Sequence, residues 1–191
     1  KQRLPPKQNK NGLVMLIALV KKEENIVEYV LYMWQIEDIL RANNMEISSI
    51  EKLVISQYNV EADTQLAIRD WYIDLISKMK DQGKVNKGHL FEIHEVIHEL
   101  NFLHNTLLNL TKDKQYNALY EEAEPNIDLL RKKSPETAMN IIETCLNGVY
   151  GVLILRLKKQ AITPDTQAAV ESISRLLALL ALNYKQIKNE Q

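Results

Sequence analysis

The amino-acid sequence predicts an all-α fold, a single helical bundle of about seven helices, and three observations lead to this prediction. Apolar side chains recur every three or four residues along nearly the whole chain, which is the period of an amphipathic helix. Glycine and proline number only five each, too few for the many turns of an all-β fold. The chain also lacks the pattern of a β-hairpin, in which two alternating apolar and polar segments are joined by a glycine turn.

Length and composition indicate one globular domain. The chain has 191 residues, of which 46% are apolar, and this is enough to bury a substantial core. We expect a single all-helical domain over residues 15–191. The stretch 1–14 is rich in lysine and glutamine and has no helical period, so we expect a disordered or artefactual N-terminal extension there.

Charge and cysteine content argue against several classes of protein. The 24 basic residues balance 25 acidic ones, so the sequence predicts no basic surface for nucleic acid. The single cysteine, Cys145, cannot form an internal disulfide and is typical of a reducing compartment, so we expect a cytoplasmic protein. The apolar run 13–20 is far shorter than the ~20 residues that span a membrane, and we expect no membrane association.

Four helices are predicted in the first half of the chain. An apolar stripe predicts the first, over 23–43. Ser48 followed by Glu51 is typical of a capping box and predicts a short second helix. A third helix over 63–83 ends at a glycine, the residue that most readily takes the left-handed conformation after a helix. The fourth runs over about 89–110.

Three further helices are predicted in the second half. The stripe over 116–130 is interrupted by Pro125, which predicts a kink or two short helices. Ser134-Pro135 and Thr163-Pro164 each place a capping residue before a proline, so we expect long helices over 135–159 and 164–188. Both long helices are apolar on nearly every side. We therefore expect them to be the most buried, unless one forms a subunit interface.

Three segments of the chain resemble a known family. They are 28–38 (EYVLYMWQIED), 142–157 (IETCLNGVYGVLILRL) and 176–184 (LLALLALNY). As a set they resemble an uncharacterised bacterial domain-of-unknown-function family of small, cytosolic, all-helical proteins, and the resemblance runs from about Met15 to the C-terminus. It implies an all-helical fold, and it implies no activity, cofactor or catalytic residue.

One motif suggests metal chemistry. His94-Glu95-x-x-His98 matches the pattern of zinc proteases, in which two histidines hold zinc and the glutamate acts as general base, and His104 stands where a third ligand is found in one class of them. That third ligand requires the helix to turn at Asn101. The apolar stripe continues past this position and includes His104, which predicts a straight helix with His104 pointing away from the other two. We therefore expect no metal, no cofactor and no catalytic residue.

Three polar side chains fall where a core is expected: Glu37, His104 and Arg156. Burying an unpaired charge is costly, so we expect Glu37 to pair either with Arg41 one turn further on or with Arg156 from another helix. Such a cluster is either a structural ion pair or the polar part of a ligand pocket.

Taken together, these features predict a non-enzymatic helical bundle that acts through protein–protein contacts or self-association, with a protein partner or a homodimer as its assembly. A zinc-dependent hydrolase using His94, Glu95, His98 and His104 is the first alternative. A bundle that binds a small ligand in a polar pocket near Glu37 and Arg156 is the second.

Overall fold

The structure is a computed structural model that describes residues 13–133 and 139–190, and this part of the chain contains eight α-helices and no β-strand. The prediction of an all-α protein is therefore confirmed. Contacts between Cα atoms divide the chain into two compact units. Unit 1 comprises the chain up to Lys21 together with Tyr32–Leu90, and unit 2 comprises Lys22–Leu31 together with Phe91 to the C-terminus. A single domain over 15–191 stays a prediction.

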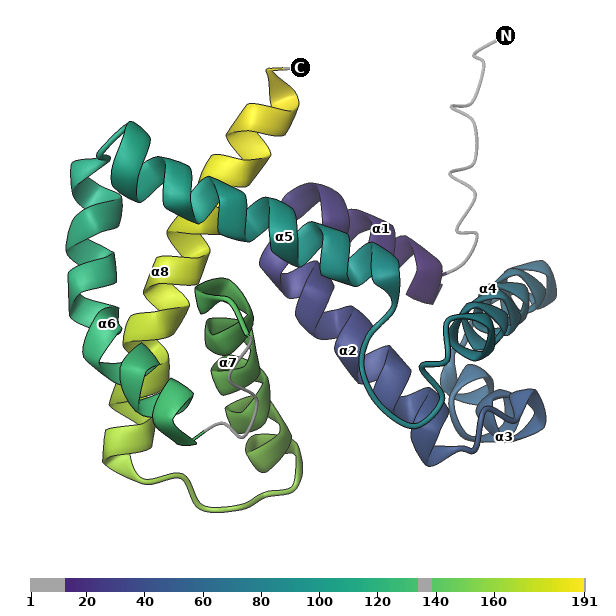
Figure 1. Ribbon diagram of the computed structural model, residues 1–191. Coiled ribbons are helices and arrows are strands. Elements are labelled where there is room, and N and C mark those ends of the chain that lie inside the picture. Colours follow the sequence, from purple (N-terminus) through teal and green to yellow (C-terminus); the bar gives the residue numbers. More distant parts are fainter. Residues whose placement is uncertain (1–12, 134–138, 191) are drawn as a thin grey trace, which may run out of the picture. The chain divides into compact units, whose positions relative to one another are not determined.

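The boundary between the two units passes through the first two helices, α1 (Leu13–Glu24) and α2 (Ile26–Ala42) (Figure 1). Three further elements belong wholly to unit 1: α3 (Ile47–Leu53), the short 3-10 turn η1 (Ile55–Gln57) and α4 (Ala62–Asp81). Within this unit, α3 and η1 pack against each other and both contact α4.

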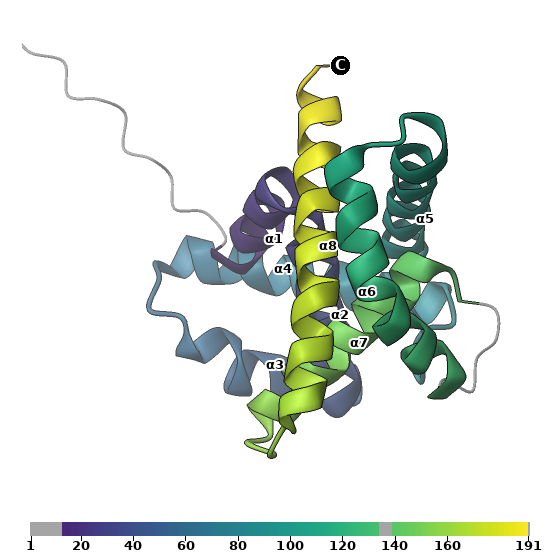
Figure 2. The ribbon, with the colours of Figure 1, turned by 90° about the vertical axis from the view of Figure 1, so that its left-hand side faces the viewer.

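Unit 2 is built on the second half of the chain. Its elements are α5 (Phe91–Asn105), a π-helical turn η2 (Thr106–Leu110), α6 (Lys114–Lys133), α7 (Ile141–Leu157) and α8 (Pro164–Asn189). Helix α6 lies along α8, and α7 packs against both of them and against α5 (Figures 1 and 2). The long α8 is therefore the helix on which the other three assemble.

Two predicted helix ends agree with the structure. Gly83 follows α4 with a φ of 67°, and the Lys84 N–H donates to the Met79 carbonyl at 2.7 Å, which is the Schellman pattern of a glycine-ended helix. At the start of α8, the Thr163 hydroxyl accepts from the Thr166 N–H, and Pro164 is the first helical residue.

One predicted helix start is wrong. Helix α3 begins at Ile47 with Glu46 in the capping position, so Ser48 already lies inside the helix and does not form the expected capping box. Of the two outcomes expected at Pro125, two short helices are wrong, because α6 is one helix from Lys114 to Lys133 with the proline inside it. The kink stays a prediction.

The helix expected over 135–159 is shorter than predicted. It begins at Ile141, where the Asn140 side chain accepts from the Glu143 N–H at 2.8 Å, while Ser134 and Pro135 lie outside the described residues. It is also less buried than expected, because most of the residues from Val149 onwards are partly exposed and Leu157 is 63% exposed. Helix α2 buries a larger share of its residues than α7 does.

No helix in the described part of the chain carries an apolar stretch long enough to cross a bilayer.

Two glycines of α7 give a matched test of the packing between α6 and α7. A Cβ at Gly148 would lie 2.5 Å from Leu130 Cδ1, whereas a Cβ at Gly151 meets no atom of the described chain within 4 Å. We expect Gly151→Ala to stabilise unit 2 by about 0.5–1 kcal/mol through helix propensity, and Gly148→Ala to be less stable than Gly151→Ala by about 1 kcal/mol or more because Leu130 must move. Urea denaturation of both variants measures this difference, and equal effects would contradict the close packing.

Candidate functional site

The Glu37 carboxylate in α2 is buried, with an exposed fraction of 1%, and it has three partners within unit 1. Its Oε2 lies 2.5 Å from His89 Nδ1, and its Oε1 accepts from the Leu90 N–H at 2.9 Å. Arg41 Nη2 approaches Oε2 at 3.9 Å. Both carboxylate oxygens are therefore satisfied, which offsets the cost of removing the charge from water.

Arg41 and Trp34 extend this cluster to the loop between α4 and α5. The Arg41 guanidinium donates to the Lys84 carbonyl from two nitrogens, at 3.3 and 3.2 Å, and to the Gly88 carbonyl. The buried Trp34 ring stacks on the His89 imidazole, with ring centroids 4.3 Å apart. These contacts hold residues 84–90 against α2, so we interpret the cluster as a structural clamp on this loop.

Of the two partners expected for Glu37, the structure brings Arg41 close. Arg156 is exposed at the last turn of α7 and donates to Gln167 Oε1 at 2.7 Å, so the prediction that it is a buried polar residue is wrong. The apolar stripe around Arg156 was misleading because the end of α7 is partly open to solvent. His89 was not predicted as a partner, since a loop residue 52 positions away carries no periodic signal.

His104 is fully buried in unit 2, where two tyrosines contact its ring. Nδ1 lies 2.8 Å from the Tyr116 hydroxyl, and the rings of Tyr116 and Tyr120 meet the imidazole edge-on. Nε2 has no hydrogen-bond partner within the described chain. Burial lowers the pKa of His104 to about 4, so the side chain is neutral near pH 7.

Cys145 is fully buried in the same unit, and burial raises the pKa of its thiol to about 12. A thiol with this pKa carries almost no thiolate near neutral pH, so the side chain is an inert core residue rather than a nucleophile.

The zinc motif is split by the geometry of α5. The helix continues through Asn101, as the stripe predicts, and so His104 faces the core while Glu95 and His98 are exposed on the opposite side. His94 is partly buried. Across the described residues, no three His, Cys, Asp or Glu side chains are grouped so that they could hold a metal ion. The third ligand of the zinc hypothesis is therefore missing from the site.

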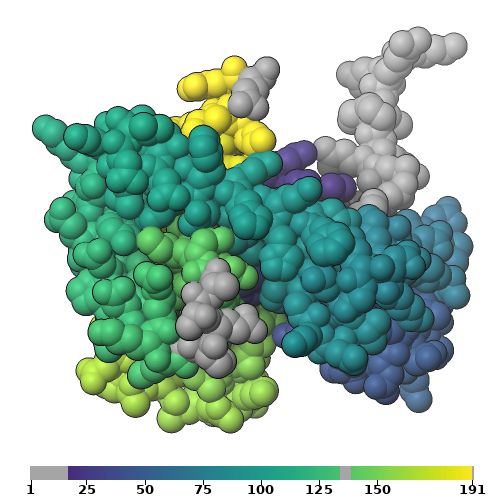
Figure 3. Space-filling model, viewed as in Figure 1, coloured from purple at the N-terminus to yellow at the C-terminus, as the bar shows by residue number. Residues whose placement is uncertain are grey.

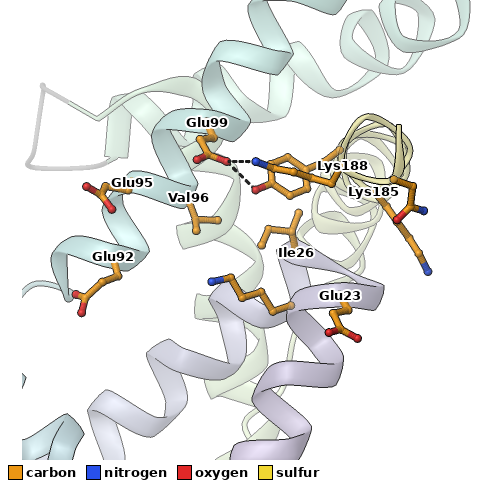
Figure 4. A pocket seen from close by; sticks show the side chains of 11 residues that line it. Glu23, Ile26, Glu92, Glu95, Val96, Glu99, Lys185 and Lys188 are labelled. Atoms are coloured by element: carbon orange, nitrogen blue, oxygen red, sulfur yellow. Dashed lines mark hydrogen bonds and ion pairs between the residues drawn. The ribbon is translucent and has the colours of Figure 1, made fainter. Parts of the chain in front are cut away.

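A cavity of about 590 Å³ lies within unit 2, beside the acidic flank of α5. Figure 4 shows Ile26 and Val96 facing one another across it, with Glu99 directed at Lys188. Glu99 Oε2 accepts from the Tyr184 hydroxyl at 2.7 Å and lies 3.5 Å from Lys188 Nζ. The charged side chains of this cavity thus link the end of α8 to α5. Its other lining residues are Lys22, Glu23, Glu92, Glu95, Lys185 and Asn189.

The outer face of α5 carries both phenylalanines of the chain. Phe91 is 56% exposed and Phe102 is 73% exposed. Eleven positions separate them, so at 100° per residue they point in nearly the same direction, with Glu95 and His98 between them. In Figure 3, the teal side chains of α5 lie on the face toward the viewer. Two large apolar side chains are thus exposed on one side of α5, with two ionisable residues between them.

Comparison with known proteins gives a family and no activity. A family model described as "Domain of unknown function (DUF4924)" matches residues 15–191. No curated protein and no solved structure matches the chain.

The buried carboxylate gives a test with a matched control. We expect Glu37→Gln to lower the free energy of unfolding by about 2 kcal/mol, because the charge-assisted contacts with His89 and Arg41 are lost. Asp38→Asn removes a partly exposed carboxylate that lies 2.9 Å from the same arginine, and we expect a change within about 0.5 kcal/mol. Urea denaturation measures both variants. An unchanged stability of Glu37→Gln would show that the buried charge is not part of the clamp.

Acid should destabilise the protein through His104. Its pKa is about 4 in the folded state against 6.5 for a histidine in water, so as the pH falls from about 6.5 to 4 the unfolded chain binds a proton that the folded chain excludes. Between pH 7 and pH 5 this costs roughly 2 kcal/mol. Over this interval we expect the stability of His104→Gln to fall by about 2 kcal/mol less than that of the wild type. Parallel curves for the two proteins would contradict the assignment.

Proposed function

The chain belongs to the DUF4924 family, a domain family of unknown function, and we propose that it is a non-enzymatic protein that acts by self-association through the outer face of α5. The observation that carries this proposal is the placement of its two phenylalanines, both exposed and both on that face.

Association through this face would be driven by the hydrophobic effect. Fully burying a phenylalanine side chain contributes about 1.5–3 kcal/mol, so a second protein that covers the exposed parts of Phe91 and Phe102 adds part of that stabilisation. The residues between them, Glu95 and His98, are polar and ionisable, which suits a surface that is exposed in the free chain. A partner that covers this face gains the apolar contact without disturbing the core below it.

Neither alternative function gains support. The zinc hydrolase needs His104 beside His94 and His98, and α5 turns it into the core, about 80° away from His94 and 120° away from His98 around the helix axis. The ligand pocket near Glu37 and Arg156 needs both groups buried together, whereas Arg156 is exposed and bound to Gln167. We also propose that the protein is cytoplasmic, because its one cysteine is a buried free thiol and free thiols are typical of a reducing compartment.

A charge on the outer face of α5 should abolish the association. We expect the wild type to form an assembly whose mass rises with concentration in sedimentation velocity, and Phe102→Glu to remain monomeric because a carboxylate would be buried in an apolar contact. Leu66→Glu is the matched control, since Leu66 is 58% exposed on α4 and lies outside this face. A wild type that stays monomeric up to its solubility limit would overturn the proposal.

A further inference from the structure

The sequence of α5 is nearly symmetric about its own middle. Read from Phe91 to Phe102 it is FEIHEVIHELNF, and its centre lies between Val96 and Ile97. Reversal of the segment exchanges Phe91 with Phe102, and it exchanges Glu95 with His98. An apolar residue thus takes the place of an apolar residue, and an acid takes the place of a base.

This symmetry coincides with the exposed face of the helix. The four residues are spaced by four, three and four positions, which is the spacing of a seam along which two helices pack. All four are exposed, while Val96 and Ile97 at the centre are buried in the core of unit 2. The exposed face is therefore self-complementary, and the buried Ile93 and Leu100 also exchange apolar for apolar.

We propose that the occupant of this face is the α5 helix of a second copy of this chain, packed antiparallel about a two-fold axis that passes between Val96 and Ile97. In this arrangement Phe91 meets the partner's Phe102, and Glu95 meets the partner's His98. The two-fold axis repeats each contact, so one surface patch serves both protomers, as a closed dimer requires. This inference rests on the proposed self-association and specifies its partner and its register.

One flank of the seam carries like charges that meet in this packing. A two-fold axis across an antiparallel pair brings like flanks together, so Glu92 approaches the partner's Glu99, and Glu95 lies near the partner's Glu95 as well as its His98. Like charges at this spacing oppose association. Glu99 is already compensated by Lys188 and by the Tyr184 hydroxyl, which weakens the repulsion. The opposite flank carries His94 and Asn101, which brings no like carboxylates together.

Mixed disulfide cross-linking tests the register. Chains carrying Phe91→Cys are mixed with chains carrying Phe102→Cys and oxidised, which leaves one phenylalanine pair intact in each mixed dimer. We expect a covalent dimer in the mixture and little in either chain alone, because each engineered cysteine lies about 16 Å along the axis from its own copy in the partner. The native Cys145 is fully buried and does not compete.

The same experiment separates the register from the proposed function. A wild type that dimerises and is dissociated by Phe102→Glu, but whose mixture does not cross-link, would overturn the antiparallel register and leave self-association standing. Strong cross-linking of Phe102→Cys alone would point to a parallel pair and overturn the register as well. A wild type that is monomeric at every concentration would overturn both.

A charge exchange provides a second test that keeps both phenylalanines. In Glu95→Lys a cation faces the partner's His98, and in His98→Glu a carboxylate faces the partner's Glu95. We expect each variant alone to dimerise severalfold more weakly than the wild type, and their mixture to recover the affinity, because the mixed dimer pairs lysine with glutamate and glutamate with histidine. A mixture as weak as its components would contradict the contact between positions 95 and 98.

Discussion

The continuous hydrogen bonding of α5 from Phe91 to Asn105 is the constraint on which the functional features of this protein depend. A helix that rotates by 100° per residue sends its side chains in directions that follow from their spacing, and only a break can change them. Because α5 does not break, His104 joins the core together with Ile93, Ile97 and Leu100. The same rotation directs Phe91 and Phe102 away from the core.

The motif that suggested metal chemistry has a different role in the proposed dimer. His94, Glu95 and His98 belong to a nearly symmetric segment in which acids and histidines exchange places on reversal. A zinc site would use the one-turn spacing of two histidines on one helix. A self-complementary surface uses the same residues for contact between two helices. The exposed side chains of Glu95 and His98 suit a contact between two helices, whereas the burial of His104 removes the third ligand of the zinc site.

The two units accommodate buried polar groups in different ways. In unit 1 the Glu37 carboxylate is surrounded by donors from His89, Leu90 and Arg41, which compensate its charge. In unit 2 His104 has one hydrogen-bond partner among the described residues, the Tyr116 hydroxyl, and burial keeps the imidazole neutral. The contacts that compensate the Glu37 charge also hold the loop against α2. The neutral His104, by contrast, makes the core of unit 2 sensitive to acid, because protonation of a buried imidazole is unfavourable.

The sequence by itself determined the helical class, most of the helices, the glycine end of α4, the proline start of α8 and the straightness of α5. These are local properties, because they depend on periodicity and on the backbone preferences of neighbouring residues. The tertiary structure decided that Arg156 is exposed, that α7 is only partly buried and that His89 contacts Glu37. A stripe shows which side of a helix is apolar, but only packing shows whether a neighbour covers it along its whole length. Contacts between a helix and a distant loop depend on chain paths that no local pattern encodes.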